Sequence, residues 1–100
     1  MSRYTVYVTP RAWDEIKDLP GNMRQRVRRE IDALADNPHP PRSKRLAIEH
    51  LEPELYRFRL DRWRILYAVT QEHRIVDVLA VRKRPPYDYG DLQKLIETLQ

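Results

Sequence analysis

The sequence predicts an α+β domain in which two helices and an N-terminal strand pack on a small antiparallel sheet. Two observations lead to this class. Up to residue 36 the apolar residues after a first strand recur with helical spacing, whereas between residues 55 and 82 they alternate or run together as in strands. A proline-rich segment separates the two halves. The expected order is therefore β-α-α-β-β-β-α, within one domain that spans residues 1–100.

The N-terminal part predicts a strand followed by a helical hairpin. The strand covers residues 3–8, where a tyrosine and two valines share one face. Thr9 then has the character of an N-cap, and Pro10 suits the first turn of a helix that ends near Pro20. A second helix is expected over residues 22–35, because its apolar residues keep helical spacing. A short turn joins the two helices.

The C-terminal part predicts an antiparallel meander. Residues 55–60 and 63–70 alternate between apolar and polar positions, and residues 74–82 form a nearly continuous apolar run that suggests a central strand. Residues 43–50 are ambiguous, with a short strand around Leu46 as one interpretation. A short helix near the C-terminus is expected to carry Leu92, Leu95, Ile96 and Leu99.

Composition restricts the class of protein. The chain has no cysteine and no apolar run long enough to cross a bilayer, so a cytoplasmic protein without disulfides is expected. The net charge is +4, and 15 of the 19 positively charged residues are arginine. Arginine grips phosphate oxygens with a planar fork, which favours nucleic-acid partners. A biased base composition of the gene would explain the arginine excess equally well.

Cationic residues are expected to gather on one sheet face. Arg57 and Arg59 alternate on one strand, and a hairpin turn at residues 61–62 would bring Arg64 near Arg59. Each arginine alone is explained by a solvated sheet face, but like charges placed together disfavour the fold unless an anion binds there. The candidate phosphate site comprises Arg57, Arg59, Arg64, Arg82, Lys83 and Arg84, with Tyr87 and Tyr89 at its edge.

Other chemistries have little support in the sequence. His39, His50 and His73 lack the spacing of metal ligands, so no metal site is expected. Gly21 and Gly90 are the only glycines, which excludes a glycine-rich phosphate loop. With two serines and no cysteine, no nucleophilic triad is apparent. We therefore expect neither a metal nor an organic cofactor.

Five segments of the chain match a known family: IKDLP at 16–20, IDALADNP at 31–38, LYRFRL at 55–60, WRILYAV at 63–69 and VLAVRKR at 78–84. Through them the chain resembles the RelE/ParE toxin superfamily over nearly its whole length. The resemblance implies a microbial-ribonuclease-like fold, ribosome-dependent mRNA cleavage in the RelE branch, and inhibition by a co-produced antitoxin in a hetero-oligomeric complex. The ParE branch shares the fold and poisons DNA gyrase.

The resemblance also implies roles for individual residues. The paired basic residues of the first meander strand match Arg57 and Arg59, although well-studied members often have lysine there. Because both positions are arginine in this chain, proton transfer by such a lysine is not expected here. The family's next arginine matches Arg64, and the one after the last strand best matches Arg84. The family's tyrosine corresponds to Tyr87 or Tyr89.

The function expected from the RelE branch is that of an endoribonuclease of a type II toxin–antitoxin system. The neighbouring 2′-hydroxyl would attack the RNA phosphodiester, so the protein needs only to align the groups, take a proton and stabilise charge. A ParE-like gyrase poison and a non-catalytic RNA-binding module are the alternatives. In this scheme Arg59, Arg64 and Arg84 stabilise charge, Tyr87 or Tyr89 handles the proton, and Arg57, Arg82 and Lys83 bind RNA.

Overall fold

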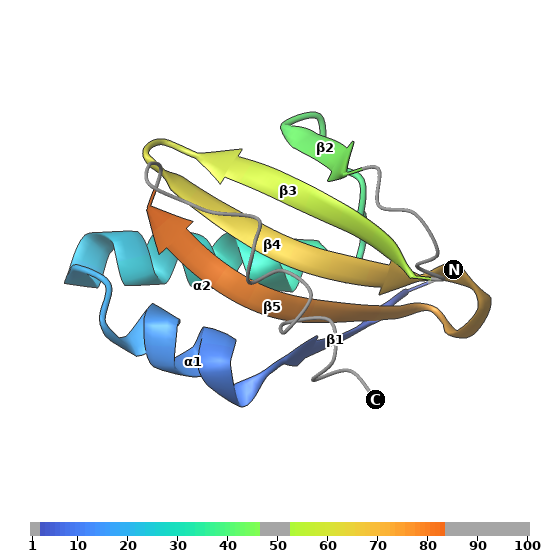
Figure 1. Ribbon diagram of the computed structural model, residues 1–100, viewed down its shortest axis with the longest axis horizontal. Coiled ribbons are helices and arrows are strands. Elements are labelled where there is room, and N and C mark those ends of the chain that lie inside the picture. The colour runs from blue at the N-terminus through green and yellow to red at the C-terminus, as the bar shows by residue number, and fades with distance from the viewer. Residues whose placement is uncertain (1–2, 47–52, 84–100) are drawn as a thin grey trace.

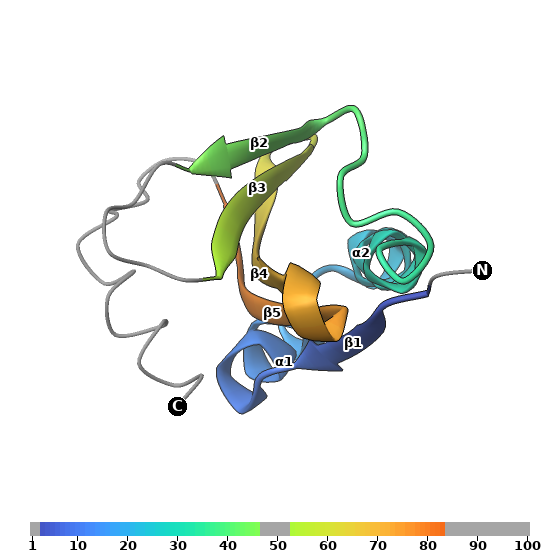
Figure 2. The same cartoon turned by 90° about the vertical axis from the view of Figure 1, so that its right-hand side faces the viewer.

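Two helices cover one face of a five-stranded sheet (Figures 1 and 2). The computed structural model describes residues 3–46 and 53–83. The expected C-terminal helix, like Arg84, Tyr87 and Tyr89, lies outside the described residues. The elements are β1 (Thr5–Val8), α1 (Pro10–Lys17), α2 (Gly21–Ala33), β2 (Ser43–Leu46), β3 (Glu54–Leu60), β4 (Trp63–Thr70), the short 3₁₀ helix η1 (Gln71–His73) and β5 (Ile75–Lys83).

The sheet has the strand order β1-β5-β4-β3-β2 and is mixed, because the N-terminal strand joins the expected small antiparallel sheet as an additional parallel strand. Strands β2 to β5 form the expected antiparallel meander, but β1 pairs in parallel with β5. The two helices and the meander separate β1 from β5 along the chain, so no tight turn imposes an antiparallel register on them. The ambiguous segment does contain a strand, β2, which pairs with β3. The α+β class is confirmed.

Local sequence signals account for the start of the helical hairpin. Thr9 caps α1, because its hydroxyl oxygen accepts a hydrogen bond from the backbone N–H of Ala12 at 3.2 Å. Ala12 and Ile16 are buried against the sheet. Trp13 lies beside this apolar stripe but remains 43% exposed, with the guanidinium of Arg28 5.9 Å from its ring centre. The buried stripe of α1 is therefore narrow.

A β-bulge explains the continuous apolar run in β5. Tyr67 pairs with Val78 and Leu66 pairs with Ala80, so Leu79 is an extra residue on the β5 side. As a result Val78 and Val81 both face the helices, while Leu79 and Ala80 both face the other side of the sheet. Both faces of β5 are therefore apolar at this point.

Tyr67 ties the proline-rich segment to the sheet. Its ring is fully buried, and its hydroxyl donates a hydrogen bond to the carbonyl oxygen of Pro38 at 2.8 Å. Burial raises the pKa of this phenol to about 12. The ring of Tyr56 stacks on it with 5.6 Å between centroids.

Within the described residues no helix is long and apolar enough to span a membrane.

Candidate nucleic-acid interface

Three arginines stand directly opposite one another on the sheet face that points away from α1 and α2, here called the distal face. Arg59 of β3 pairs with Arg64 of β4, and Arg64 pairs with Arg82 of β5. Directly opposed residues place their side chains on the same face about 5 Å apart at Cβ, so their like charges repel. We call these three residues the arginine row. The register expected from the two-residue turn between β3 and β4 is confirmed.

Arg64 occupies the middle of the row and is only 4% exposed. Its Nη1 donates hydrogen bonds to the carbonyl oxygens of Asp61 at 3.1 Å and Trp63 at 2.9 Å. Asp61 has a φ of 54°, a conformation that aspartate tolerates better than most residues. Its carboxylate in turn pairs with Arg26 of α2 at 2.5 Å. The turn and α2 therefore fix the position of the Arg64 guanidinium.

Arg82 is held by a carboxylate from α1. Glu15 accepts the Nε–H of Arg82 at 3.2 Å and the backbone N–H of Val81 at 3.0 Å. The register of β1 with β5 ends at Val78, so β5 continues beyond its strand partner. Glu15 supplies the acceptor that a neighbouring strand would otherwise provide. The same contact orients the third member of the arginine row.

The remaining predicted cations divide between the two faces. Arg57 shares the distal face with the row and pairs with Lys44 of β2, a cation that the sequence analysis missed because β2 was ambiguous. Arg59 is exposed, whereas Arg57 is half-buried. Lys83 pairs with Trp63 and so lies on the helix side. The sheet therefore brings Arg57, Arg59, Arg64 and Arg82 together but not Lys83.

The distal face changes character away from the arginines. The end of the distal face that lies away from the arginine row is apolar and includes a cluster of buried residues. One carboxyl group, that of Asp77, lies beside this cluster. Asp77 of β5 pairs with Ala68 and with Tyr7 of the edge strand β1. Burial raises the pKa of the Asp77 carboxyl. The buried apolar residues are Leu55, Leu66, Ala68, Leu79 and Ala80.

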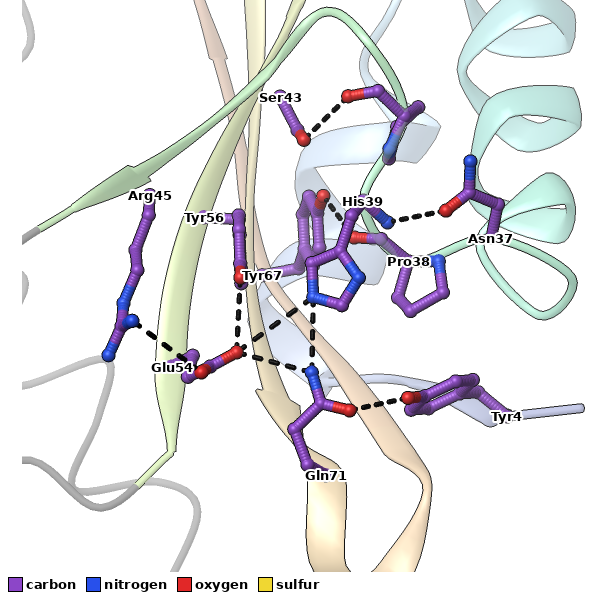
Figure 3. A network of polar contacts seen from close by, with 11 residues as sticks. Tyr4, Asn37, Pro38, His39, Ser43, Arg45, Glu54, Tyr56, Tyr67 and Gln71 are labelled. Atoms are coloured by element: carbon purple, nitrogen blue, oxygen red, sulfur yellow. Dashed lines mark hydrogen bonds and ion pairs between the residues drawn. The ribbon is translucent and has the colours of Figure 1, made fainter. Parts of the chain in front are cut away.

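A second polar group, here called the glutamate cluster, surrounds the carboxylate of Glu54 at the start of β3 (Figure 3). Glu54 accepts hydrogen bonds from the amide of Gln71 at 3.2 Å and the hydroxyl of Tyr56 at 3.0 Å. Arg45 lies 3.6 Å from this carboxylate and His39 Nε2 lies 3.8 Å from it. The hydrogen bond from Gln71 is the main cause that lowers the pKa of Glu54.

Gln71 connects this cluster to the residue before β1 and to the proline-rich segment. Tyr4 donates its hydroxyl proton to Gln71 Oε1, and Gln71 Nε2 lies 3.1 Å from His39 Nε2 (Figure 3). Since the amide nitrogen has no lone pair to offer, the His39 nitrogen is the acceptor. These contacts join five chain segments: the residue before β1, the proline-rich segment, β2, β3 and η1. No group of metal-ligating side chains occurs among residues 3–46 and 53–83.

The comparison that decides the family is the match of a family model, described as the ParE toxin of type II toxin–antitoxin systems, parDE, to residues 6–85. The chain belongs to this family. It is therefore a toxin of a type II toxin–antitoxin system. The arginine row, Arg57 and Glu54 with its partners Arg45, Tyr56 and Gln71 all lie within the matched range. The resemblance stated from the sequence is thereby confirmed.

One relative and two solved structures are similar to this chain over most of its length. A curated protein named "Putative toxin RelE1" from Methanocaldococcus jannaschii is 27% identical over 84 residues, which are 82% of this chain and 91% of the relative. The structure of the RelE–RelB complex from Pyrococcus horikoshii matches with a TM-score of 0.75 at 23% identity, over 87% of this chain and 100% of that one. The toxin–antitoxin complex RelBE2 from Mycobacterium tuberculosis matches with a TM-score of 0.70 at 28% identity, over 82% and 99% of the two chains.

Proposed function

We propose that this toxin is an endoribonuclease that cuts mRNA on the ribosome, in the cytoplasm. The arginine row carries the proposal. Three guanidinium groups lie side by side on neighbouring strands, and Glu15 pairs with one of them, Arg82. Together they favour a phosphodiester that gains negative charge in the transition state. The likeness to proteins named RelE adds support, because it extends over most of the chain.

In the proposed mechanism the arginines stabilise negative charge and do not transfer protons. Arginine stays protonated up to about pH 12, so it is a poor acid but a dependable donor to phosphate oxygens. Arg59 is exposed and contacts the phosphate directly, while Arg64 adds its field from a fixed and buried position. Glu15 holds Arg82 at the edge of the row. Each direct donor of this kind is worth roughly 10²–10³ in rate.

Proton transfer is assigned to residues that follow β5. Arg84 adds a further cation to the phosphate site, and Tyr87 or Tyr89 takes the proton from the attacking 2′-hydroxyl. The new bond from the 2′-oxygen to phosphorus replaces the bond to the 5′-oxygen, which leaves with a proton from water, and a cyclic phosphate remains. A tyrosine with an ordinary pKa near 10 is a weak base at neutral pH, but neighbouring arginines favour its ionised form. RNA supplies the nucleophile, so the proposed reaction includes no metal or cofactor. Arg57 binds the RNA backbone next to the reacting phosphate, and Lys83 binds it from the helix side.

We further propose that a cognate antitoxin binds this toxin and forms a hetero-oligomeric complex. Two of the matched structures are complexes of RelE with RelB and of the pair RelBE2. A chain with net charge +4 and clustered arginines attracts RNA without sequence preference unless its cationic face is covered or distorted. An acidic segment that folds on binding would meet this requirement.

Primer extension on cellular mRNA after brief induction tests the nuclease proposal. Expression of the toxin should produce new 5′ ends within coding regions, and Arg59→Ala should remove them. The matched control is Arg29→Ala, which also removes an exposed arginine but from α2, away from the distal face. New ends that persist at full strength in Arg59→Ala would contradict the assignment of the row.

A ParE-like gyrase poison is the second candidate, favoured by the description of the matching family model. This candidate predicts growth arrest without new mRNA ends and with trapped gyrase–DNA cleavage complexes. A third candidate, a non-catalytic RNA-binding module on the same cationic face, predicts neither new ends nor trapped gyrase. The same induced cultures can be assayed for both signals, so one experiment separates the three.

A further inference from the structure

A hollow of about 400 Å³ opens where α1 ends beside the first residue of β4 and the last residues of β5. Its apolar lining comes from Leu19, Trp63 and Val81. Leu19 and Val81 are buried, whereas Trp63 is half-buried and so offers part of its indole to the hollow. A partly exposed aromatic ring in an apolar recess is the usual stacking surface for an unpaired nucleobase.

Four charged side chains complete the lining. The carboxylates are Glu15 and Asp18, and the cations are Arg82 and Lys83. Glu15 already accepts hydrogen bonds from β5 with both of its oxygens, whereas Asp18 is exposed at the end of α1. Asp18 is therefore the carboxylate available to a ligand. A carboxylate accepts hydrogen bonds from the amino group of a base but repels the carbonyl oxygens that flank the ring N–H of uracil.

Arg82 connects the hollow with the arginine row. Its side chain lines the hollow, while its strand position is opposite Arg64 on the distal face. The contact with Glu15 holds the guanidinium at the edge of β5, between these two surfaces. A base seated beside Trp63 therefore has its own phosphate next to Arg82, the member of the row that also lines the hollow. An uncharged peptide side chain would make no use of this arrangement.

We propose that this hollow is a subsite for one unpaired RNA base that carries an amino group. The base stacks on Trp63, its amino group donates to Asp18, and Arg82 and Lys83 bind the adjoining phosphate. This inference rests on the proposed action on RNA and adds a selectivity to it: adenine, cytosine and guanine are accepted in preference to uracil.

Fluorescence of Trp63 provides the test. The chain has two tryptophans, and Trp13→Phe leaves Trp63 as the only one. Titration of the full-length Trp13→Phe toxin with AMP, CMP, GMP and UMP should give saturable quenching, with UMP bound about tenfold more weakly than the other three. The two indole N–H resonances of the wild-type toxin give the same readout by NMR should Trp13→Phe fail to fold.

Asp18→Asn sharpens the test, because an amide can donate as well as accept. In this variant the preference against UMP should disappear. Asp14→Asn is the matched control: Asp14 lies on the same helix, pairs with Lys17 at 3.2 Å and does not line the hollow. The control should retain the wild-type preference.

Three outcomes overturn the proposal: no saturable response of Trp63, a preference against UMP that is unchanged in Asp18→Asn, or a Trp63 response to an antitoxin peptide but to none of the nucleotides. The last would assign the hollow to a protein contact. Binding of mononucleotides requires no cleavage, so the two proposals fail separately. A toxin that cuts mRNA with a silent Trp63 refutes only the subsite, and a responsive Trp63 in a toxin that cuts no mRNA refutes only the nuclease.

Discussion

The two ends of the sheet treat charge in opposite ways. At the end where β3 turns into β4, the arginine row places three like charges side by side. At the far end, where β4 leads into η1, Glu54 is surrounded by donors and opposite charges (Figures 1 and 3). The second arrangement stabilises the fold by itself, and the first is better suited to a bound anion. The difference separates a structural polar cluster from a candidate functional one within one sheet.

Substitutions at the end of the sheet that holds the glutamate cluster should therefore lower the stability of the fold without abolishing mRNA cleavage. The largest loss of stability is expected at Tyr67. Tyr67→Ala removes a fully buried ring that stacks on Tyr56 and whose hydroxyl binds the Pro38 carbonyl, so the free energy of unfolding should fall by about 3–5 kcal/mol. Tyr67→Phe keeps the ring and should cost only about 1 kcal/mol, the value of one hydrogen bond. Urea denaturation measures both. Equal losses in the two variants would show that packing contributes nothing here.

At the arginine end, the loss of Arg64 should lower both the stability of the fold and the cleavage of mRNA. Its guanidinium is buried and donates to the carbonyls of Asp61 and Trp63, so Arg64→Ala should cost about 2–3 kcal/mol in addition to abolishing mRNA cleavage. Arg59→Ala is the comparison, because Arg59 is exposed and its loss should change stability by less than about 0.5 kcal/mol. Thermal melts and primer extension on the same two variants test this. An Arg64→Ala variant as stable as wild type would show that the hydrogen bonds of Arg64 to the Asp61 and Trp63 carbonyls do not stabilise the fold.

Local patterns explain which parts of the fold could be predicted. The Thr9 cap and the pairing of Arg59 with Arg64 depend on residues close in sequence, and both were predictable. The parallel pairing of β1 and the contact of Glu15 with β5 join distant segments, which periodicity does not encode.

Burial was predictable only in part. Alternation places Arg64 on the polar side of β4 but gives no sign that its guanidinium is buried. The glutamate cluster was missed for a related reason, since His39 and Glu54 meet only after the proline-rich segment folds back on the sheet. A signal was present in the paired tyrosines near Glu54, because a buried phenol needs a polar partner. The residues Arg84, Tyr87 and Tyr89 stay predictions.

The glutamate cluster should also make stability depend on pH. The pKa of Glu54 is lower in the folded protein than its ordinary value of 4.5, so the ionised carboxylate favours the folded state. This contribution is complete above about pH 5 and is lost as the pH falls through the lowered folded pKa. Glu54→Gln should therefore be about 1 kcal/mol less stable than wild type at pH 7, with the difference shrinking below pH 4.5. Urea midpoints between pH 3 and pH 7 measure it.

The smallest effect is expected on the distal face, and it has the opposite sign. Burial raises the pKa of Asp77 above its ordinary value of 3.8, so the folded protein disfavours the ionised carboxylate. Between these two pKa values the folded state binds more protons than the unfolded state, and stability falls as the pH rises. Asp77→Asn removes this penalty and should stabilise the toxin by about 0.5 kcal/mol at pH 7. The gain should vanish as the pH approaches 3.8, which urea midpoints of the two proteins would show. A variant that is less stable than wild type at pH 7 would mean that the Asp77 carboxylate has a favourable partner in the fold. The contrast between the two carboxylates, with Glu54 favoured by its donors and Asp77 disfavoured by burial, would then be wrong.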